Sequence, residues 1–220
     1  MSEDSREYFE SVADKWDKMR RTFFGEGVRD AAIAAADINS SSIVVDVGIG
    51  TGFIAEGALA AGARVIGVDS SDGMLEQARK RFGVARFEAR SGDIESLPVG
   101  TSEVDVVLGS MVLHHAANPP RAILEMARIL KPRGRVVITD ADSHQHEWLR
   151  IEQHDRWLGF ERANIVRWFR DAGLVDVSVS DTCETCSPTS ECGTKAEITI
   201  FLARGLKPPA AVPAGRNDFS

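Results

Sequence analysis

The sequence of 220 residues has only three cysteines, and all of them lie within ten residues, at Cys183, Cys186 and Cys192. This odd, clustered set argues against an extracellular disulfide framework. No run of eighteen apolar residues occurs, so we expect no membrane-spanning helix and no membrane insertion. The segment from Met1 to Ser5 is polar and acidic, which argues against a signal peptide and favours a cytoplasmic location.

Basic clusters are also scarce. The formal net charge is −7, which argues against nucleic acid as a partner because phosphate binding draws on clustered Lys and Arg. The longest basic cluster, Lys18 to Arg21, is short and flanked by acids, and we interpret it as a solvated helix face. Hydrophobic residues make up 43% and charged residues 27% of the chain, as in an ordinary globular domain with one core.

The order of apolar patterns indicates the fold class. Residues 5–37 have helical periodicity. Seven short apolar runs follow, at 43–47, 64–68, 84–89, 104–109, 135–139, 174–179 and 197–203. Helical patterns separate most of them, near 51–61, 72–82, 119–130 and 144–172. Alternation of this kind predicts an α/β fold with a doubly wound, mostly parallel sheet. No helix separates the last two runs, so we expect the final strand to be antiparallel.

A glycine-rich loop follows the first apolar run. Asp46 ends that run, and Gly48, Gly50 and Gly52 come after it at alternate positions. The second apolar run ends in Asp69, where a carboxylate is placed to accept the two hydroxyls of a ribose. Glycine lets the backbone pass close to a ligand. We therefore predict a site for a cofactor that contains a nucleoside.

The spacing also distinguishes between cofactors. A dinucleotide fingerprint needs a third glycine where this chain has Phe53, whose ring would crowd a pyrophosphate. The motif instead resembles the class I S-adenosylmethionine (SAM) methyltransferases, in particular the type 11 and ubiquinone–menaquinone biosynthesis group. The resemblance covers residues 5–204. It implies a seven-stranded Rossmann-like sheet with a reversed last strand, a helical lid at 1–40, a SAM-binding domain at 41–204 and a flexible tail at 205–220.

The resemblance also implies which residues contact SAM. They follow the strand ends: Asp46, Gly48, Gly50, Gly52, Asp69, Ser70, Met74, Asp93, Ile94 and Ser110. Met74 is equally consistent with core packing, and Asp93 with a turn. Tyr8 and Trp16 are candidate lid contacts, although aromatics at helical spacing also build cores.

Three histidines lie where the acceptor of the methyl group is expected. His114 and His115 follow the fourth apolar run, and His144 follows the fifth. Each is a candidate general base or substrate ligand. Each is also consistent with a hydrogen-bonded structural role, and the segment of His144 with a helix start capped by Asp142 or Ser143. We assign Asn118, which precedes two prolines, to the cap of the helix at 119–130.

The cysteines have several interpretations. Cys183 and Cys186 have a spacing that chelates one soft ion, and Cys192 could add a third thiolate. The set has a distant resemblance to that of arsenite methyltransferases, but the cysteines those enzymes carry elsewhere are missing here. The same residues are also consistent with a zinc clip, a redox pair or ordinary packing.

The sequence therefore predicts a SAM-dependent methyltransferase, with S-adenosylhomocysteine as product, that acts on a small molecule. A thiol, a metalloid or a phenolic or quinone-type group is the expected acceptor. A non-catalytic module that binds SAM or a metal is one alternative, and a nicotinamide oxidoreductase is another. The sequence leaves the oligomeric state open.

Overall fold

Seven strands form one sheet in the order β3-β2-β1-β4-β5-β7-β6 in the computed structural model, which describes residues 3–210. The strands are β1 (Ile43–Val47), β2 (Arg64–Asp69), β3 (Phe87–Ser91), β4 (Val104–Ser110), β5 (Leu130–Ala141), β6 (Val175–Cys186) and β7 (Ile198–Leu206). The first five pair in parallel, whereas β7 runs antiparallel to β5 and β6. The predicted α/β class and reversed last strand are confirmed.

Eight helices and one 3-10 turn accompany the strands in the described part of the chain. They are α1 (Glu3–Val12), α2 (Trp16–Phe23), α3 (Gly27–Ala36), α4 (Phe53–Ala60), α5 (Asp72–Phe82), η1 (Leu113–His115), α6 (Pro119–Ile129), α7 (Trp148–Glu152) and α8 (Arg162–Asp171). Between residues 3 and 210, no helix has the length and apolar character needed to cross a membrane.

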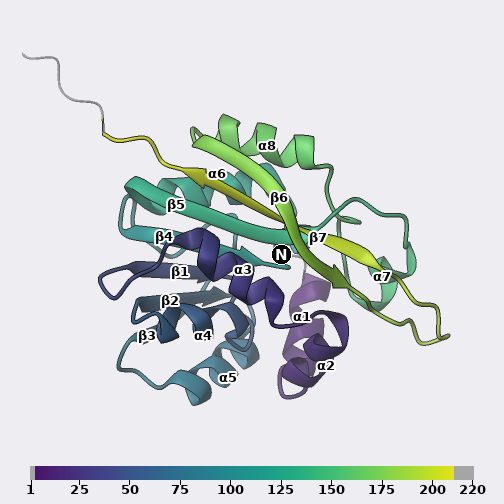
Figure 1. Cartoon of the computed structure of the whole chain (residues 1–220). Coiled ribbons are helices and arrows are strands. Elements are labelled where there is room, and N and C mark those ends of the chain that lie inside the picture. Colours follow the sequence, from purple (N-terminus) through teal and green to yellow (C-terminus); the bar gives the residue numbers. More distant parts are fainter. Residues whose placement is uncertain (1–2, 211–220) are drawn as a thin grey trace, which may run out of the picture.

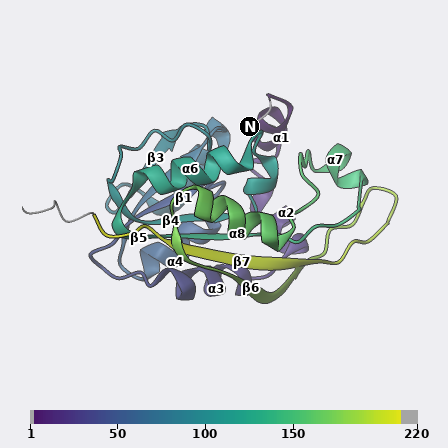
Figure 2. The same ribbon diagram turned by 90° about the horizontal axis from the view of Figure 1, so that it is seen from above.

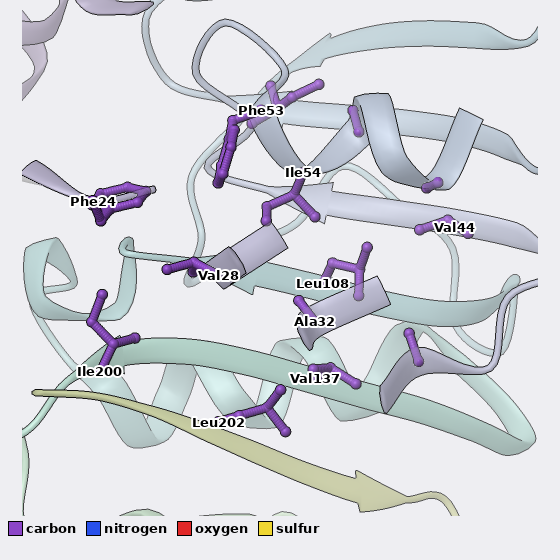
Figure 3. Close-up of a cluster of buried hydrophobic side chains, with 14 of the residues drawn as sticks. Phe24, Val28, Ala32, Val44, Phe53, Ile54, Leu108, Val137, Ile200 and Leu202 are labelled. Carbon is purple, nitrogen blue, oxygen red and sulfur yellow. The ribbon is translucent and has the colours of Figure 1, made fainter. Parts of the chain in front are cut away.

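The helices cover both faces of the sheet (Figures 1 and 2). One apolar cluster packs α3, α4 and α5 onto the sheet, and Figure 3 shows Phe24, Phe53 and Ile54 within it. A second cluster packs α6 and α8 onto the opposite face. Both faces are therefore buried, which explains why the central strands are continuous Val, Ile and Leu runs rather than alternating patterns.

The order of the strands positions a crevice. The chain reverses its winding between β1 and β4, which lie side by side, and ligands of open α/β sheets bind at the carboxyl ends of the strands at such a point. Figure 2 shows α1, α2 and α7 gathered at one end of the sheet, where β7 begins. Because β7 is antiparallel, that end carries the carboxyl ends of the parallel strands.

Local capping explains where two helices begin. The Oδ1 atom of Asn118 accepts a hydrogen bond from the amide of Arg121 (3.2 Å), with Pro119 in the first helical position, so the predicted cap is confirmed. The hydroxyl oxygen of Ser71 accepts from the amide of Met74 (3.1 Å) at the start of α5.

Three predicted boundaries are wrong. The helical pattern at 144–172 is two helices, because residues 153–161 fold back and the amides of Arg156 and Trp157 donate to the carbonyl of His114. The run at 84–89 begins too early, since Val84 is 92% exposed and β3 starts at Phe87. The sixth strand runs seven residues beyond 179, through a bulge, and therefore contains two of the cysteines.

The expected flexible tail at 205–220 also begins too early. Strand β7 continues to Leu206, and the Nζ atom of Lys207 donates to the carbonyls of Ala127, Arg128 and Leu130 at 2.9, 3.3 and 2.7 Å. Lys207 thus satisfies carbonyls at the end of α6 that have no partner within the helix. The rest of this tail, residues 211–220, lies outside the described residues, as do residues 1 and 2 of the expected lid.

Replacing Lys207 by alanine should lower the free energy of unfolding by about 1–3 kcal/mol, because three carbonyls lose a charged donor. Chemical denaturation measures this loss. The exposed Lys195 is the control, and Lys195→Ala should be close to neutral. Equal effects of the two substitutions would contradict the assignment.

Candidate functional site

A cavity opens at the carboxyl ends of β1, β2 and β4, beneath α2. Nine of the twelve predicted cofactor residues line it: Trp16, Asp46, Gly48, Gly50, Asp69, Ser70, Met74, Ile94 and Ser110. We call this space the cofactor cavity. It lies where the strand ends and the glycine loop were expected to meet.

Asp69 connects two segments of the wall of this cavity by hydrogen bonds. Its Oδ2 atom accepts from the amide of Gly50 in the glycine loop (2.9 Å), and its Oδ1 atom accepts from the amide of Ser71 at the start of α5 (3.0 Å). Burial raises the pKa of Asp69, although these hydrogen bonds oppose the shift. One carboxylate therefore joins the ends of β1 and β2 and still has free lone pairs for a ligand.

The three glycines of the loop have different structural roles. Gly48 and Gly50 line the cavity, and a side chain on Gly48 would collide with Val112. Gly52 is not among the lining residues. It begins α4 with a φ of +94°, and a Cβ atom there would meet the ring of Phe82. Its role in this structure is to start the helix rather than to contact a ligand.

Two more predicted contacts lie outside the cavity. Asp93 does not line it, although Ile94 does, and the Oδ1 atom of Asp93 accepts from the amide of Glu95 (2.8 Å) as a turn former. The hydroxyl of Tyr8 donates to Gln153 (3.1 Å), and its ring contacts His154 at 4.7 Å between centroids. Tyr8 therefore contacts the segment after α7, while Trp16 lines the cofactor cavity.

One buried arginine of this cavity was not predicted from the sequence. Arg20, interpreted above as part of a solvated face, is 4% exposed and lines the cofactor cavity. Its guanidinium lies 3.8 Å from the ring centroid of Phe53. Its terminal nitrogens donate to Phe24 and Glu26 at 3.2 Å each, whereas Nε is buried without a partner in the described structure. Arg20 follows Trp16 by four residues, which places both on one face of α2 and is the signal that could have found it.

Asp46 lies beneath the loop. It is 1% exposed, and its Oδ2 atom accepts from the amide of Ala55 in α4 (3.0 Å). Burial raises the pKa of Asp46 to about 8, and the charge of Asp69 adds to the shift. Its carboxyl group therefore anchors the start of α4 and is protonated over much of the neutral range.

A second cavity adjoins the first, and we call it the acceptor cavity. The two share the side chains of Phe9, Trp16, Phe24, Met111 and His115. All three predicted histidines line the acceptor cavity, together with Phe23, Trp157, Asp155 and Cys186. It therefore combines an aromatic lining with imidazoles at the border of the cofactor cavity.

His114 is held by carboxylates. Its Nδ1 atom lies 2.7 Å from Asp140, and its Nε2 atom lies 3.7 Å from Asp155. Burial lowers the pKa of His114, but the two carboxylates outweigh it and raise the value to about 9. Asp155 was not among the predicted residues, because it lies in the segment between α7 and α8 and carries no local motif.

The other two histidines are neutral at neutral pH. Burial and the neighbouring His114 hold the pKa of His115 well below its ordinary value, and burial lowers that of His144 to about 4. The helix start considered for His144 is wrong, because the carboxylate of Asp142 accepts from Arg162 and Thr199 and caps nothing.

The three cysteine side chains do not form a cluster. Cys183 and Cys192 are exposed, whereas Cys186 lines the acceptor cavity, and burial raises its pKa to about 12. Within residues 3–210, the one group of three potential ligands whose atoms lie within 4.8 Å of one another contains no cysteine. A metal or metalloid site made of these three thiolates is therefore not supported.

Comparison with known proteins finds a similar family for the central part of the chain. Residues 45–138 match the family model described as a methyltransferase domain. The match runs from β1 into β5 and so includes the glycine loop, Asp69 and the paired histidines. This part of the chain is therefore similar to the methyltransferase domain family.

Proteins similar to this chain include enzymes named for quinone and hydroquinone methylation. Demethylmenaquinone methyltransferase of Thermobifida fusca is 36% identical over 158 residues, which cover 69% of this chain and 65% of the relative. The 2-methyl-6-phytyl-1,4-hydroquinone methyltransferase 2 of Oryza sativa is 32% identical, with 70% and 45% covered. The chain spans less than two thirds of the length of the first curated relatives it matches.

A solved structure supports the same fold. A methyltransferase determined in complex with a methyltransferase activator of Haloferax volcanii superposes with a TM-score of 0.75 at 25% identity. The superposition covers 91% of this chain and 97% of the other.

The raised pKa of Asp46 predicts a pH effect on the stability of this protein. A carboxyl group whose folded pKa exceeds its unfolded value stabilises the fold fully only below the unfolded value, and the contribution is lost as the pH rises toward 8. The substitution Asp46→Asn keeps an acceptor for the Ala55 amide and removes the titration. Between pH 5 and 8, the free energy of unfolding of the variant should rise relative to that of the wild type, by up to about 1.4 kcal/mol per pH unit.

Thermal unfolding of both proteins without ligand, at several pH values, measures this difference. Parallel stability curves across that range would show that Asp46 ionises normally.

Proposed function

We propose that this chain transfers a methyl group from SAM to a small aromatic acceptor that carries a hydroxyl group, of the phenol or hydroquinone type. One observation carries the proposal: the cofactor cavity and the acceptor cavity share a wall. A methyl donor bound in one would therefore face an acceptor bound in the other, with His115 and Met111 between them.

The cofactor cavity fits SAM. Asp69 supplies a carboxylate for the ribose hydroxyls, and the buried hydroxyl of Ser70 has no partner in the described structure. Arg20 supplies a buried cation with a free Nε–H, which suits the carboxylate of the methionine part. Phe53 fills the first turn of α4, which a pyrophosphate would need. These features favour SAM over a nicotinamide dinucleotide.

SAM supplies an electrophilic methyl carbon, so the chain has to align the acceptor and exclude water rather than provide a nucleophile. The aromatic side chains of Phe9 and Trp16 suit this task, because their rings contact edge to face at 5.2 Å over both cavities. We assign these two residues to closing the site.

The lining of the acceptor cavity favours an aromatic acceptor. Phe9, Trp16, Phe23, Phe24 and Trp157 offer ring faces and edges for a planar molecule. Relatives named as menaquinone and hydroquinone methyltransferases support the same class. A metalloid acceptor has less support because the cysteine side chains do not gather.

We assign the three predicted histidines to contact with the acceptor. His144 faces the acceptor cavity alone, whereas His115 borders both cavities. Hydrogen bonds from these imidazoles to the hydroxyl group would fix the orientation of the ring. A role as general base is part of this proposal for His115 and His144, whose lowered pKa values leave a ring nitrogen unprotonated at neutral pH.

Arg20 gives the first test of the cofactor. Arg20→Ala should weaken binding of S-adenosylhomocysteine by about tenfold to a hundredfold, because a charge-assisted pair is worth roughly 1.5–3 kcal/mol. Arg21 is exposed on the same helix, and Arg21→Ala should bind as the wild type does. Titration calorimetry measures both. Tighter binding of NADH than of S-adenosylhomocysteine by the wild type would favour the oxidoreductase instead.

A bulky side chain placed in the acceptor cavity tests whether the methyl acceptor binds there. Gln153 lines the acceptor cavity but not the cofactor cavity. Gln153→Trp should lower methyl transfer at least tenfold, measured with radiolabelled SAM and a panel of phenols, hydroquinones and thiols, and should leave binding of S-adenosylhomocysteine unchanged. Gln153→Ala is the matched control and should retain transfer. Cofactor binding without transfer to any acceptor of the panel would favour a non-catalytic module.

A further inference from the structure

Three potential metal ligands meet in the wall of the acceptor cavity. They are His114 and His115 of η1, and Asp155 from the segment between α7 and α8. One ligand atom from each lies within 4.8 Å of the others, and the described residues contain no second group of this kind. Two imidazoles and one carboxylate are a donor set that suits a divalent transition metal ion.

His114 is oriented for ligation. Its Nδ1 atom contacts Asp140, whose carboxylate is fully buried and also accepts from the amides of Leu113 and Ala141. Asp140 is thus fixed by the backbone and in turn fixes the imidazole plane. Histidines that bind metals commonly donate their second N–H to a carboxylate in this way. The arrangement leaves the Nε2 atom of His114 for a ligand.

The distance to Asp155 fits a shared ion. The Nε2 atom of His114 lies 3.7 Å from the Oδ1 atom of Asp155, which is too far for a hydrogen bond. Two atoms bound to one tetrahedral zinc ion at about 2.0–2.1 Å lie about 3.4 Å apart. A shift of a few tenths of an ångström would therefore bring this pair into a common coordination shell.

His115 completes the group. Its Nδ1 atom contacts the carbonyl of His154 at 3.3 Å, which leaves Nε2 for the ion. The rings of His114 and His115 lie 4.1 Å apart between centroids. Phe9 packs edge to face on His115 at 5.0 Å and restricts its rotation.

The surroundings of the group are negative. Asp140 and Asp155 are both buried, with side chains 0% and 11% exposed, and in residues 3–210 neither forms an ion pair with Lys or Arg. The imidazole of His114 is their one ion-pair partner in the described residues, so at most one positive charge faces two buried carboxylates, an arrangement that is costly unless a further cation compensates it. A divalent ion bound between the imidazoles and Asp155 would balance both charges.

We propose that His114, His115 and Asp155 bind one divalent transition metal ion, and that its open coordination positions receive the hydroxyl oxygen of the acceptor. Three protein ligands leave at least one position free. All three residues line the acceptor cavity, and His115 also borders the cofactor cavity, so the bound oxygen would lie beside the methyl donor. The second half of this proposal rests on the proposed methyl transfer, whereas the metal site stands independently of it.

Metal binding can be measured without any methyl acceptor. Protein treated with a chelator is dialysed against Zn²⁺, and the bound zinc is counted by mass spectrometry; Co²⁺ is then added, and its visible absorption reports the coordination geometry. We expect one equivalent per chain with a spectrum typical of nitrogen and oxygen ligands. Asp155→Asn and His115→Gln should each weaken zinc binding at least tenfold, and Asp140→Asn should weaken it by about tenfold to a hundredfold.

Two matched controls separate this site from other ligands. His146→Gln changes a histidine outside the group, and the double variant Cys183→Ser/Cys192→Ser removes the exposed thiols; both should bind zinc as the wild type does. Circular dichroism and binding of S-adenosylhomocysteine should be unchanged in Asp155→Asn, because Asp155 does not line the cofactor cavity. Zinc binding that survives Asp155→Asn and His115→Gln, or that is lost only in the cysteine variant, would overturn the proposal. Failure to bind S-adenosylhomocysteine would instead contradict the proposed function.

Discussion

The carboxylate of Asp69 is the constraint on which the site depends. It accepts hydrogen bonds from the backbone amides of Gly50 and Ser71. It therefore joins the glycine loop after β1 to the start of α5 after β2. Because β1 lies next to β4 at the point where the sheet reverses its winding, the same cavity is also lined by Met111 and His115, which follow β4. A single buried acid therefore fixes the position of the glycine loop relative to the start of α5.

The two cavities differ in the parts of the fold that line them. The cofactor cavity is lined by the strand ends and the loops that follow them, and Phe9, Trp16 and Arg20 of α1 and α2 complete it. The acceptor cavity takes much of its lining from α1, α2, η1 and the segment around α7, and Ala141, Cys186 and Ile198 add residues of β5, β6 and β7. Variation of the segment around α7 could change the acceptor without disturbing the cofactor, which agrees with the general finding that function lies in sites placed on common folds.

Sequence reasoning was most successful where the chemistry is local. The strands, the glycine loop and Asp69 follow from short patterns, since each depends on neighbours within a few residues. Arg20 was misread because burial of a cation on a polar helix depends on Phe53, which is distant in the sequence. Asp155 was missed for the same reason, because only the folding of residues 153–161 over η1 brings it to His114. Tertiary packing decided these cases against the local pattern.

A crystal structure of the protein with S-adenosylhomocysteine tests the central claim most directly. The account predicts the ribose at Asp69, the carboxylate of the ligand within hydrogen-bond distance of Arg20, and the sulfur directed at the wall that Met111 and His115 share with the acceptor cavity. A ligand bound elsewhere, or with its sulfur directed away from that wall, would contradict it.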